Sequence, residues 1–187
     1  MAAPVGRHTI GPDQGRVLLR TYRQGLAASV GHDLVIQLAR WSAEFVVAED
    51  AVVTELSAVL DLTSLTVLEG VGGVKPLSDR DRRDIVSTAR KQLSADRVPE
   101  ARFTATSLSP DANGGGTVAG TLSLAGAQRP FTLRVEAPDG DRYHATGQVV
   151  QSEFGIKPYS GFFGALKLRD AVDIEIEVDL SDTGSSG

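Results

Sequence analysis

The 187-residue chain contains no cysteine and only three histidines. Without cysteine it can form neither a disulfide scaffold nor a thiolate metal site, and it has no cysteine nucleophile. The histidines, His8, His32 and His144, lie far apart in the sequence, so we expect no metal centre built from them. The 24 acidic residues exceed the 19 basic ones, which argues against nucleic-acid binding, because that function usually needs a basic face.

Long apolar runs are also absent. No stretch approaches the roughly 18 apolar residues of a membrane-spanning helix, so we expect no stable membrane insertion. Residues 1–11 lack the apolar core of about 7–15 residues that a secretory signal needs, which favours a cytoplasmic location. Because no low-complexity linker divides the chain, we expect one domain at residues 14–181, with an N-terminal tail at 1–13 and a flexible C-terminal tail at 182–187.

What the sequence does contain is apolar and polar alternation with a period of two. In the clearest case, residues 172–180, apolar side chains alternate with acidic ones and so form one apolar and one acidic face of a strand. Eight other segments have strand character: 16–22, 34–40, 42–48, 56–62, 101–108, 117–124, 131–136 and 143–151. We predict an all-β fold, an antiparallel barrel of about eight strands, because closure removes the unpaired edges of such a sheet.

One segment, residues 78–93, has helical periodicity instead. Ser78 is a suitable N-cap, and Ile85, Ala89 and Leu93 recur at spacings of four residues on one face. Charged residues cover the other faces. We interpret this segment as an amphipathic helix that packs on the barrel as a lid, with docking to a partner protein or a membrane surface as the alternative.

Catalytic motifs do not occur in the chain. No G-x-S-x-G nucleophile motif is present, and the adjacent His32 and Asp33 would point to opposite faces of a strand. The glycine-rich stretch 70–75 lacks the spacing of a phosphate-binding loop, so we interpret it as a mobile connection. We therefore predict that the protein is not an enzyme and needs no cofactor or metal. A weak enzyme that uses His32 near Lys157 is a remaining alternative.

Four segments carry short motifs in a fixed order. The longest is the hairpin VAGTLSLAGAQRPFTL at residues 118–133, and the others are DLTSL at 61–65, PEARFTATS at 99–107 and EFGI at 153–156. Together they resemble the YceI-like family, whose members have a lipocalin-like barrel. The resemblance implies non-catalytic binding, storage or transport of an elongated apolar ligand inside the barrel: a polyisoprenoid, an isoprenoid quinone or a fatty-acid derivative.

Candidate ligand contacts are mostly aromatic. Residues 154–168 gather four aromatic side chains and two lysines in a glycine-containing loop, which either contacts an apolar ligand and its polar head or plugs one end of the barrel. The predicted ligand-binding residues are Trp41, Phe45, Phe103, Phe131, Phe154, Tyr159, Phe162, Phe163, His32 and Lys157. For His32, a purely structural role is the competing interpretation.

Small residues at predicted inward positions favour a hollow interior: Ala58, Ala105, Gly120, Ala145 and Gly147. If the barrel is filled instead, the chain is a protein-interaction or stress-related module that docks through the charged helix at residues 78–93. The sequence leaves open which ligand is bound and whether the protein forms a homodimer.

Overall fold

The computed structural model of the chain describes residues 4–181, so the tail predicted at 182–187 lies outside the described residues. Its main sheet has eleven strands in the order β1-β5-β6-β8-β9-β10-β11-β14-β2-β4-β7, and each pair is antiparallel. The bounds are β1 Gly6–Ile10, β2 Gly15–Thr21, β4 His32–Leu38, β5 Trp41–Val47, β6 Val53–Asp61, β7 Leu65–Gly72, β8 Glu100–Pro110, β9 Gly116–Leu124, β10 Ala127–Glu136, β11 Arg142–Val150 and β14 Ala171–Asp179. A second sheet joins β3 (Arg23–Gln24), β12 (Ser160–Gly161) and β13 (Leu166–Leu168).

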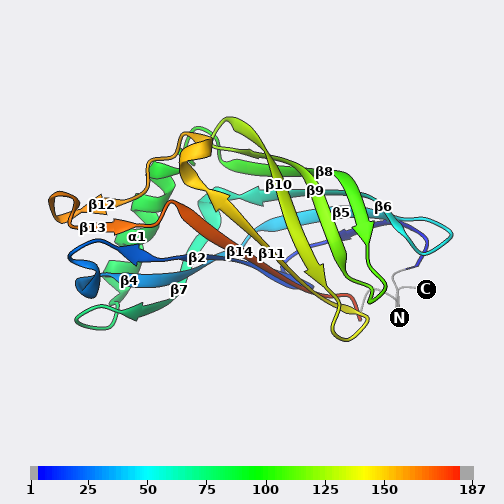
Figure 1. Cartoon of the computed structure of the whole chain (residues 1–187), viewed down its shortest axis with the longest axis horizontal. Coiled ribbons are helices and arrows are strands. Elements are labelled where there is room, and N and C mark those ends of the chain that lie inside the picture. Colours follow the sequence, from blue (N-terminus) through cyan, green and yellow to red (C-terminus); the bar gives the residue numbers. More distant parts are fainter. Residues whose placement is uncertain (1–3, 182–187) are drawn as a thin grey trace.

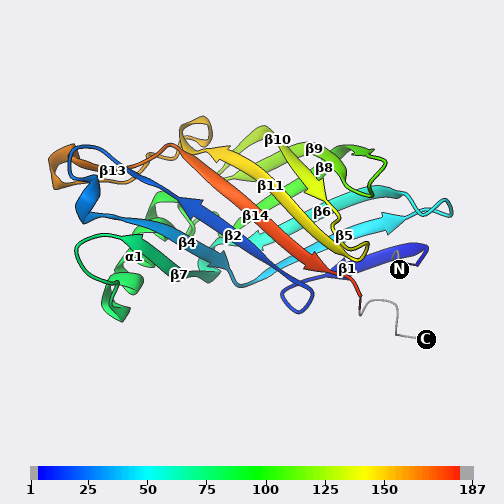
Figure 2. The same cartoon turned by 60° about the horizontal axis from the view of Figure 1, so that its bottom comes forward.

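The main sheet curls around one interior, as Figures 1 and 2 show. The strand order begins at β1 and ends at β7, but the sheet still closes into a barrel. Closure occurs at a corner where β4 continues into β5 and β6 continues into β7. At this corner the Asp61 N–H donates a hydrogen bond to Arg40 O (3.0 Å), and the Ala39 N–H donates one to Ser64 O (3.1 Å). β4 and β5 therefore form one bent strand that pairs along its length with β7 and β6.

The predicted all-β class with antiparallel strands is confirmed, but the strand number exceeds the predicted eight. Some long strands of the barrel bend at corners and are divided there into two shorter strands, such as β4 and β5, which raises the number of strands. The end of β7, residues 70–72, falls in the stretch 70–75 that was predicted as a mobile connection, because Gly70 and Gly72 weaken the strand signal, while Leu65 and Val67 pair with β4. β1 lies within residues 1–13, the predicted tail, where its five residues pair with β5.

Helix α1 (Asp79–Gln92) begins at the predicted cap. The Asp81 N–H donates a hydrogen bond to Ser78 Oγ (3.2 Å), and the Ser78 N–H donates one to the Asp81 carboxylate (2.9 Å), which completes a capping box. The hydrogen bond from the Ser78 hydroxyl holds the pKa of Asp81 below its ordinary value. No helix among the described residues is long and apolar enough to cross a membrane.

Two sets of contacts hold α1 over one end of the barrel. Ile85, Ala89 and Leu93 pack against the core. Arg82 Nη1 donates hydrogen bonds to the carbonyl oxygens of Val67 (2.8 Å) and Leu68 on β7 (2.9 Å). The helix is thus a lid, in agreement with the sequence-based interpretation.

The polar faces of the strands form charge pairs on the outside of the wall. Arg20 on β2 donates to Glu175 on β14 at 2.6 Å, and Arg16 donates to Glu177 at the same distance. His144 on β11 lies 3.2 Å from Glu175 on the other side. The hydrogen bond from Arg20 holds the pKa of Glu175 below its ordinary value. Neighbouring strands therefore neutralise the acidic face that the alternation predicted, while its apolar face turns inward.

Candidate ligand-binding site

A cavity of about 1170 Å³ occupies the interior of the barrel. This volume exceeds the roughly 300–1,000 Å³ of most small-molecule pockets. The inward faces of the strands supply a mainly aliphatic wall, which includes Val17, Leu19, Leu34, Ile36, Leu38, Leu56, Leu60, Leu122, Leu133, Val149, Ile174, Ile176 and Val178. Because the interior is hollow, the alternative of a filled barrel lacks its structural basis.

The cavity reaches both ends of the barrel. At the α1 end its lining includes Val30 and Val74, and at the other end it includes Val52 and Gly140. The first pair comes from the loops beside α1, and the second comes from the tight turns that join β5 to β6 and β10 to β11. The arrangement is therefore an elongated channel, which suits a long molecule better than a compact one.

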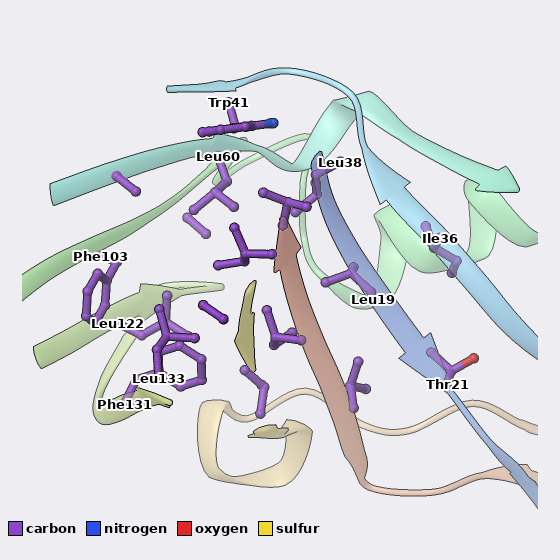
Figure 3. Close-up of a pocket in the computed structure, with 18 of the residues that line it drawn as sticks. Leu19, Thr21, Ile36, Leu38, Trp41, Leu60, Phe103, Leu122, Phe131 and Leu133 are labelled. Carbon is purple, nitrogen blue, oxygen red and sulfur yellow. The ribbon is translucent and has the colours of Figure 1, made fainter. Parts of the chain in front are cut away.

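Six of the ten predicted ligand contacts line this cavity: His32, Trp41, Phe45, Phe103, Phe131 and Tyr159. Phe103 and Phe131 meet edge to face with ring centroids 5.9 Å apart. Figure 3 shows both rings at the lower left beside Leu122 and Leu133, with Trp41 at the top of the view. The fold brings these side chains together, and their contact with a ligand stays a prediction.

The other four predicted contacts lie outside the main cavity. Phe154 is buried in the core at the end of a 3₁₀ turn, η3 (Gln151–Phe154). Lys157 and Phe163 border a separate surface hollow. Phe162 and Phe163 are 67% and 113% exposed, and both have left-handed backbone angles (φ 49° and 54°) in the η4 turn (Phe162–Gly164). The cluster expected at 154–168 is therefore divided between core, cavity and surface.

Glycines in the wall have a different role from the one predicted. A Cβ at position 120 would lie 2.8 Å from the Phe103 ring, and one at 147 would lie 2.8 Å from the Phe131 ring. Gly120 and Gly147 thus allow the two rings to lie close against the backbone of the wall. The two glycines add to the cavity space only indirectly, because the rings that pack over them lie close to the wall. Two of the predicted small residues do line the cavity, Ala58 and Ala145.

Polar groups in the lining are sparse. Thr21 Oγ1 and Trp41 Nε1 are buried and have no hydrogen-bond partner among the described residues. An unpaired buried donor or acceptor costs roughly 1–3 kcal/mol. Tyr143 also lines the cavity, and its burial raises the pKa of the phenol above its ordinary value. The wall therefore offers an apolar environment that does not attract a charged ligand to its middle.

His32 has a structural contact in addition to its place in the lining. Its Nε2 lies 2.9 Å from Lys75 O, and its ring fills the space beside Gly73. The next residue, Asp33, instead accepts a hydrogen bond from the Arg23 N–H at 2.8 Å. The two side chains do not form a dyad. Among residues 4–181, no group of three or more His, Asp or Glu side chains is placed to hold a metal ion.

The sequence-based prediction missed several lining residues that the alternation of inward and outward positions along the strands indicates. Leu19 and Thr21 alternate on β2, and Leu34, Ile36 and Leu38 alternate on β4. Alternation was the available signal, because every second residue of a barrel strand faces the interior. The prediction instead selected aromatic residues, although most of the wall is aliphatic.

These features define a class: an antiparallel lipocalin-like barrel with one covering helix and a hollow, apolar interior. A model of the YceI-like domain matches residues 14–180, and the chain belongs to this family. No curated protein matches it. Among solved structures, BcnA of Burkholderia cenocepacia is similar with a TM-score of 0.55 and 16% identity, over 87% of this chain and 94% of that chain. A YCEI protein of Campylobacter jejuni is similar with a TM-score of 0.53 and 16% identity, over 77% and 83%. These likenesses show a shared fold.

Proposed function

We propose that the protein binds an elongated apolar molecule inside the barrel and stores or transports it without chemical change. The ligand class is a polyisoprenoid, an isoprenoid quinone or a fatty-acid derivative. The observation that carries the proposal is the apolar channel of about 1170 Å³. Membership of the YceI-like family supports it, because that family is known for polyisoprenoid binding.

The energetics of such a site come from the wall. Each CH₂ group transferred from water to the interior contributes roughly 0.8 kcal/mol, so a long chain needs few polar contacts for tight binding. The same property makes selectivity broad, since aliphatic walls distinguish poorly between apolar chains of similar width. Two observations support a non-catalytic role. The His32 ring forms a hydrogen bond with Lys75 O in the loop before α1, and Lys157 lies outside the cavity lining.

Lipid extraction followed by mass spectrometry tests the proposal directly. We expect the purified protein to release an isoprenoid or acyl lipid, and we expect the delipidated protein to gain thermal stability when an isoprenoid quinone is added. Ligand binding to the native state alone raises the unfolding temperature, with a gain of roughly 2.7 kcal/mol at a hundredfold excess over Kd. Absence of bound lipid together with absence of any thermal shift would refute the proposal.

A pair of matched variants links binding to the cavity. Ala58→Phe places a ring inside the channel, because Ala58 lines it. Ala119→Phe adds the same ring to β9 at a position outside the cavity lining. We expect Ala58→Phe to reduce lipid uptake several-fold and Ala119→Phe to leave it unchanged. Equal uptake by both variants would mean that lipid binds elsewhere on the protein.

A further inference from the structure

Three surface segments meet at the α1 end of the barrel, and we call them together the basic rim: residues 22–31, 70–78 and 156–169. Hydrogen bonds join them. The Ala27 N–H donates to Ala165 O (2.9 Å), and Arg23 Nη1 donates to Val71 O (3.5 Å). In both Figure 1 and Figure 2 the turn before β4, the loop after β7 and the β12–β13 hairpin lie at the same end of the molecule.

Most of the exposed large apolar side chains lie in the basic rim. Nine large apolar side chains are exposed among residues 4–181, and six of them belong to the rim: Leu26, Val30, Val71, Val74, Phe162 and Phe163. Leu26 and Phe163 are fully exposed, at 101% and 113%. Val30 and Val74 also line the cavity, so part of this apolar surface borders the end of the channel beside α1. A concentration of this kind marks an interaction site.

The charge of the basic rim is opposite to that of the whole protein. The chain has a formal net charge of −5, yet the three segments contain no acidic residue. Their basic residues are Arg23, Lys75, Lys157, Lys167 and Arg169. The surface therefore combines exposed aromatic and aliphatic side chains with positive charge, which is the composition that binds the interface of an anionic bilayer.

Acidic residues next to the rim are partly engaged. Asp33 accepts a hydrogen bond from the Arg23 N–H, and Asp170 accepts one from the Ser152 N–H at 2.8 Å. Residues 79–84 of α1 contain three aspartates and three arginines, and this part of the helix is formally neutral. The Arg23 side chain lies 3.8 Å from the Asp33 carboxylate, and Asp81 of α1 interacts with the charge of Lys75. The charge that the rim presents therefore rests mainly on Lys157, Lys167 and Arg169, which form no ion pair with another residue of 4–181.

We propose that the basic rim docks on the surface of an anionic lipid bilayer, with Phe162 and Phe163 inserted between the headgroups. The α1 end of the channel would then face the membrane, and an apolar ligand could pass between bilayer and cavity beside the helix without crossing water. This interaction goes beyond the proposed ligand binding. It is a peripheral contact, in which no segment spans the bilayer.

Vesicle sedimentation tests the docking surface without any cavity ligand. The 187-residue protein is mixed at low ionic strength with vesicles of phosphatidylcholine alone or of phosphatidylcholine with phosphatidylglycerol. We expect binding to the mixed vesicles and much weaker binding to the neutral ones. The double variant Phe162→Ser, Phe163→Ser should bind the mixed vesicles at least about tenfold more weakly, because two exposed rings no longer leave water.

A matched control removes an exposed apolar residue elsewhere. Val5 is 61% exposed and lies outside the rim, so Val5→Ser should bind the mixed vesicles like the unmodified protein. Unchanged vesicle binding by the phenylalanine double variant, or equal binding to both vesicle types, would overturn the proposal. The proposal would also be overturned if the unmodified protein self-associates without vesicles and the phenylalanine double variant does not. The surface would then bind a second copy of the chain. Lipid extraction from the same samples reports on the cavity separately.

Discussion

The two ends of the barrel differ in charge and in the side chains that they expose. The basic rim carries five basic residues and no acidic one, whereas the turns at 48–52, 111–115 and 137–141 at the other end carry five acidic residues and no basic one. These acidic turns and the rim line opposite ends of the same cavity. The two ends of the channel therefore differ in electrostatic potential. This difference would direct the basic rim, and not the acidic turns, toward an anionic surface.

Charge reversal at each end is the change with the largest expected effect. Each basic side chain near an anionic surface contributes about fivefold to binding, so Lys157→Glu with Lys167→Glu, which changes the rim by four charge units, should weaken vesicle binding several hundredfold at low salt. The matched double variant at the acidic turns, Glu49→Lys with Asp139→Lys, should bind at least as well as the unmodified protein. Sedimentation with anionic vesicles measures both. Equal losses in the two variants would mean that the ends do not differ in function.

Packing at the two ends can be compared through a pair of glycines with similar backbone angles. Gly73 (φ 73°) lies in the rim and Gly140 (φ 77°) in an acidic turn. A Cβ at 140 meets no atom within 4 Å, so Gly140→Ala should cost only the left-handed backbone, about 1–2 kcal/mol. A Cβ at 73 would overlap the His32 ring, and Gly73→Ala should cost about 1–3 kcal/mol more. Urea unfolding measures this difference.

A second background identifies the cause of that difference. In a His32→Ala background the imidazole is absent, so the two glycine substitutions should become similar in their effect on the free energy of unfolding. A difference that persists without the imidazole would show that His32 does not organise the loop before α1.

The smallest expected effect concerns two exposed carboxylates. Hydrogen bonds from Ser78 and Ser181 hold the pKa values of Asp81 and Asp179, respectively, below their ordinary value. A carboxyl with a lowered folded-state pKa stabilises the protein above its unfolded pKa of about 4, and this contribution is lost as the pH falls through the folded-state value. Asp81→Asn and Asp179→Asn should therefore lower the Tm slightly at pH 7 and converge with the unmodified protein at low pH.

Hydrogen exchange separates the two positions. Because Asp81 belongs to the capping box of α1, Asp81→Asn should also increase exchange of the first amides of the helix, whereas Asp179→Asn should leave α1 unaffected. A Tm difference that is as large in acid as at pH 7 would contradict the carboxylate explanation.

Most strands and the helix could be predicted because their signals are local. Alternation in residues 172–180 and the Ser78 cap each appear within a few neighbouring residues, and β14 and α1 lie where these signals place them. β1 and β7 could not be predicted in this way. β1 is short, and β7 contains glycines that disfavour strands on their own. Pairing with β5 and β4 supplies the hydrogen bonds that make them strands.

The candidate site shows the same limit. Phe103, Phe131 and Tyr159 were placed in the lining from sequence, whereas Phe154 and Phe163, from the same predicted loop as Tyr159, lie in the core and on the surface. Residue type alone could not place Phe154, Tyr159 and Phe163, because aromatic side chains occur in cores, in cavity walls and on binding surfaces. Whether a side chain faces the cavity depends on the turn that carries it, and Phe163 lies with a left-handed backbone in the turn between β12 and β13.

By itself the sequence determined the all-β class, the amphipathic helix and the apolar inner faces, because periodicity follows directly from residue order. Its four ordered motifs also pointed to the YceI-like family. Only the tertiary structure decided that the wall encloses a channel, that glycines at 120 and 147 hold aromatic rings against the backbone, and that three distant segments join in a basic, apolar rim. These features depend on which strands become neighbours. That outcome is set by long-range pairing around the whole barrel, which no local window of sequence contains.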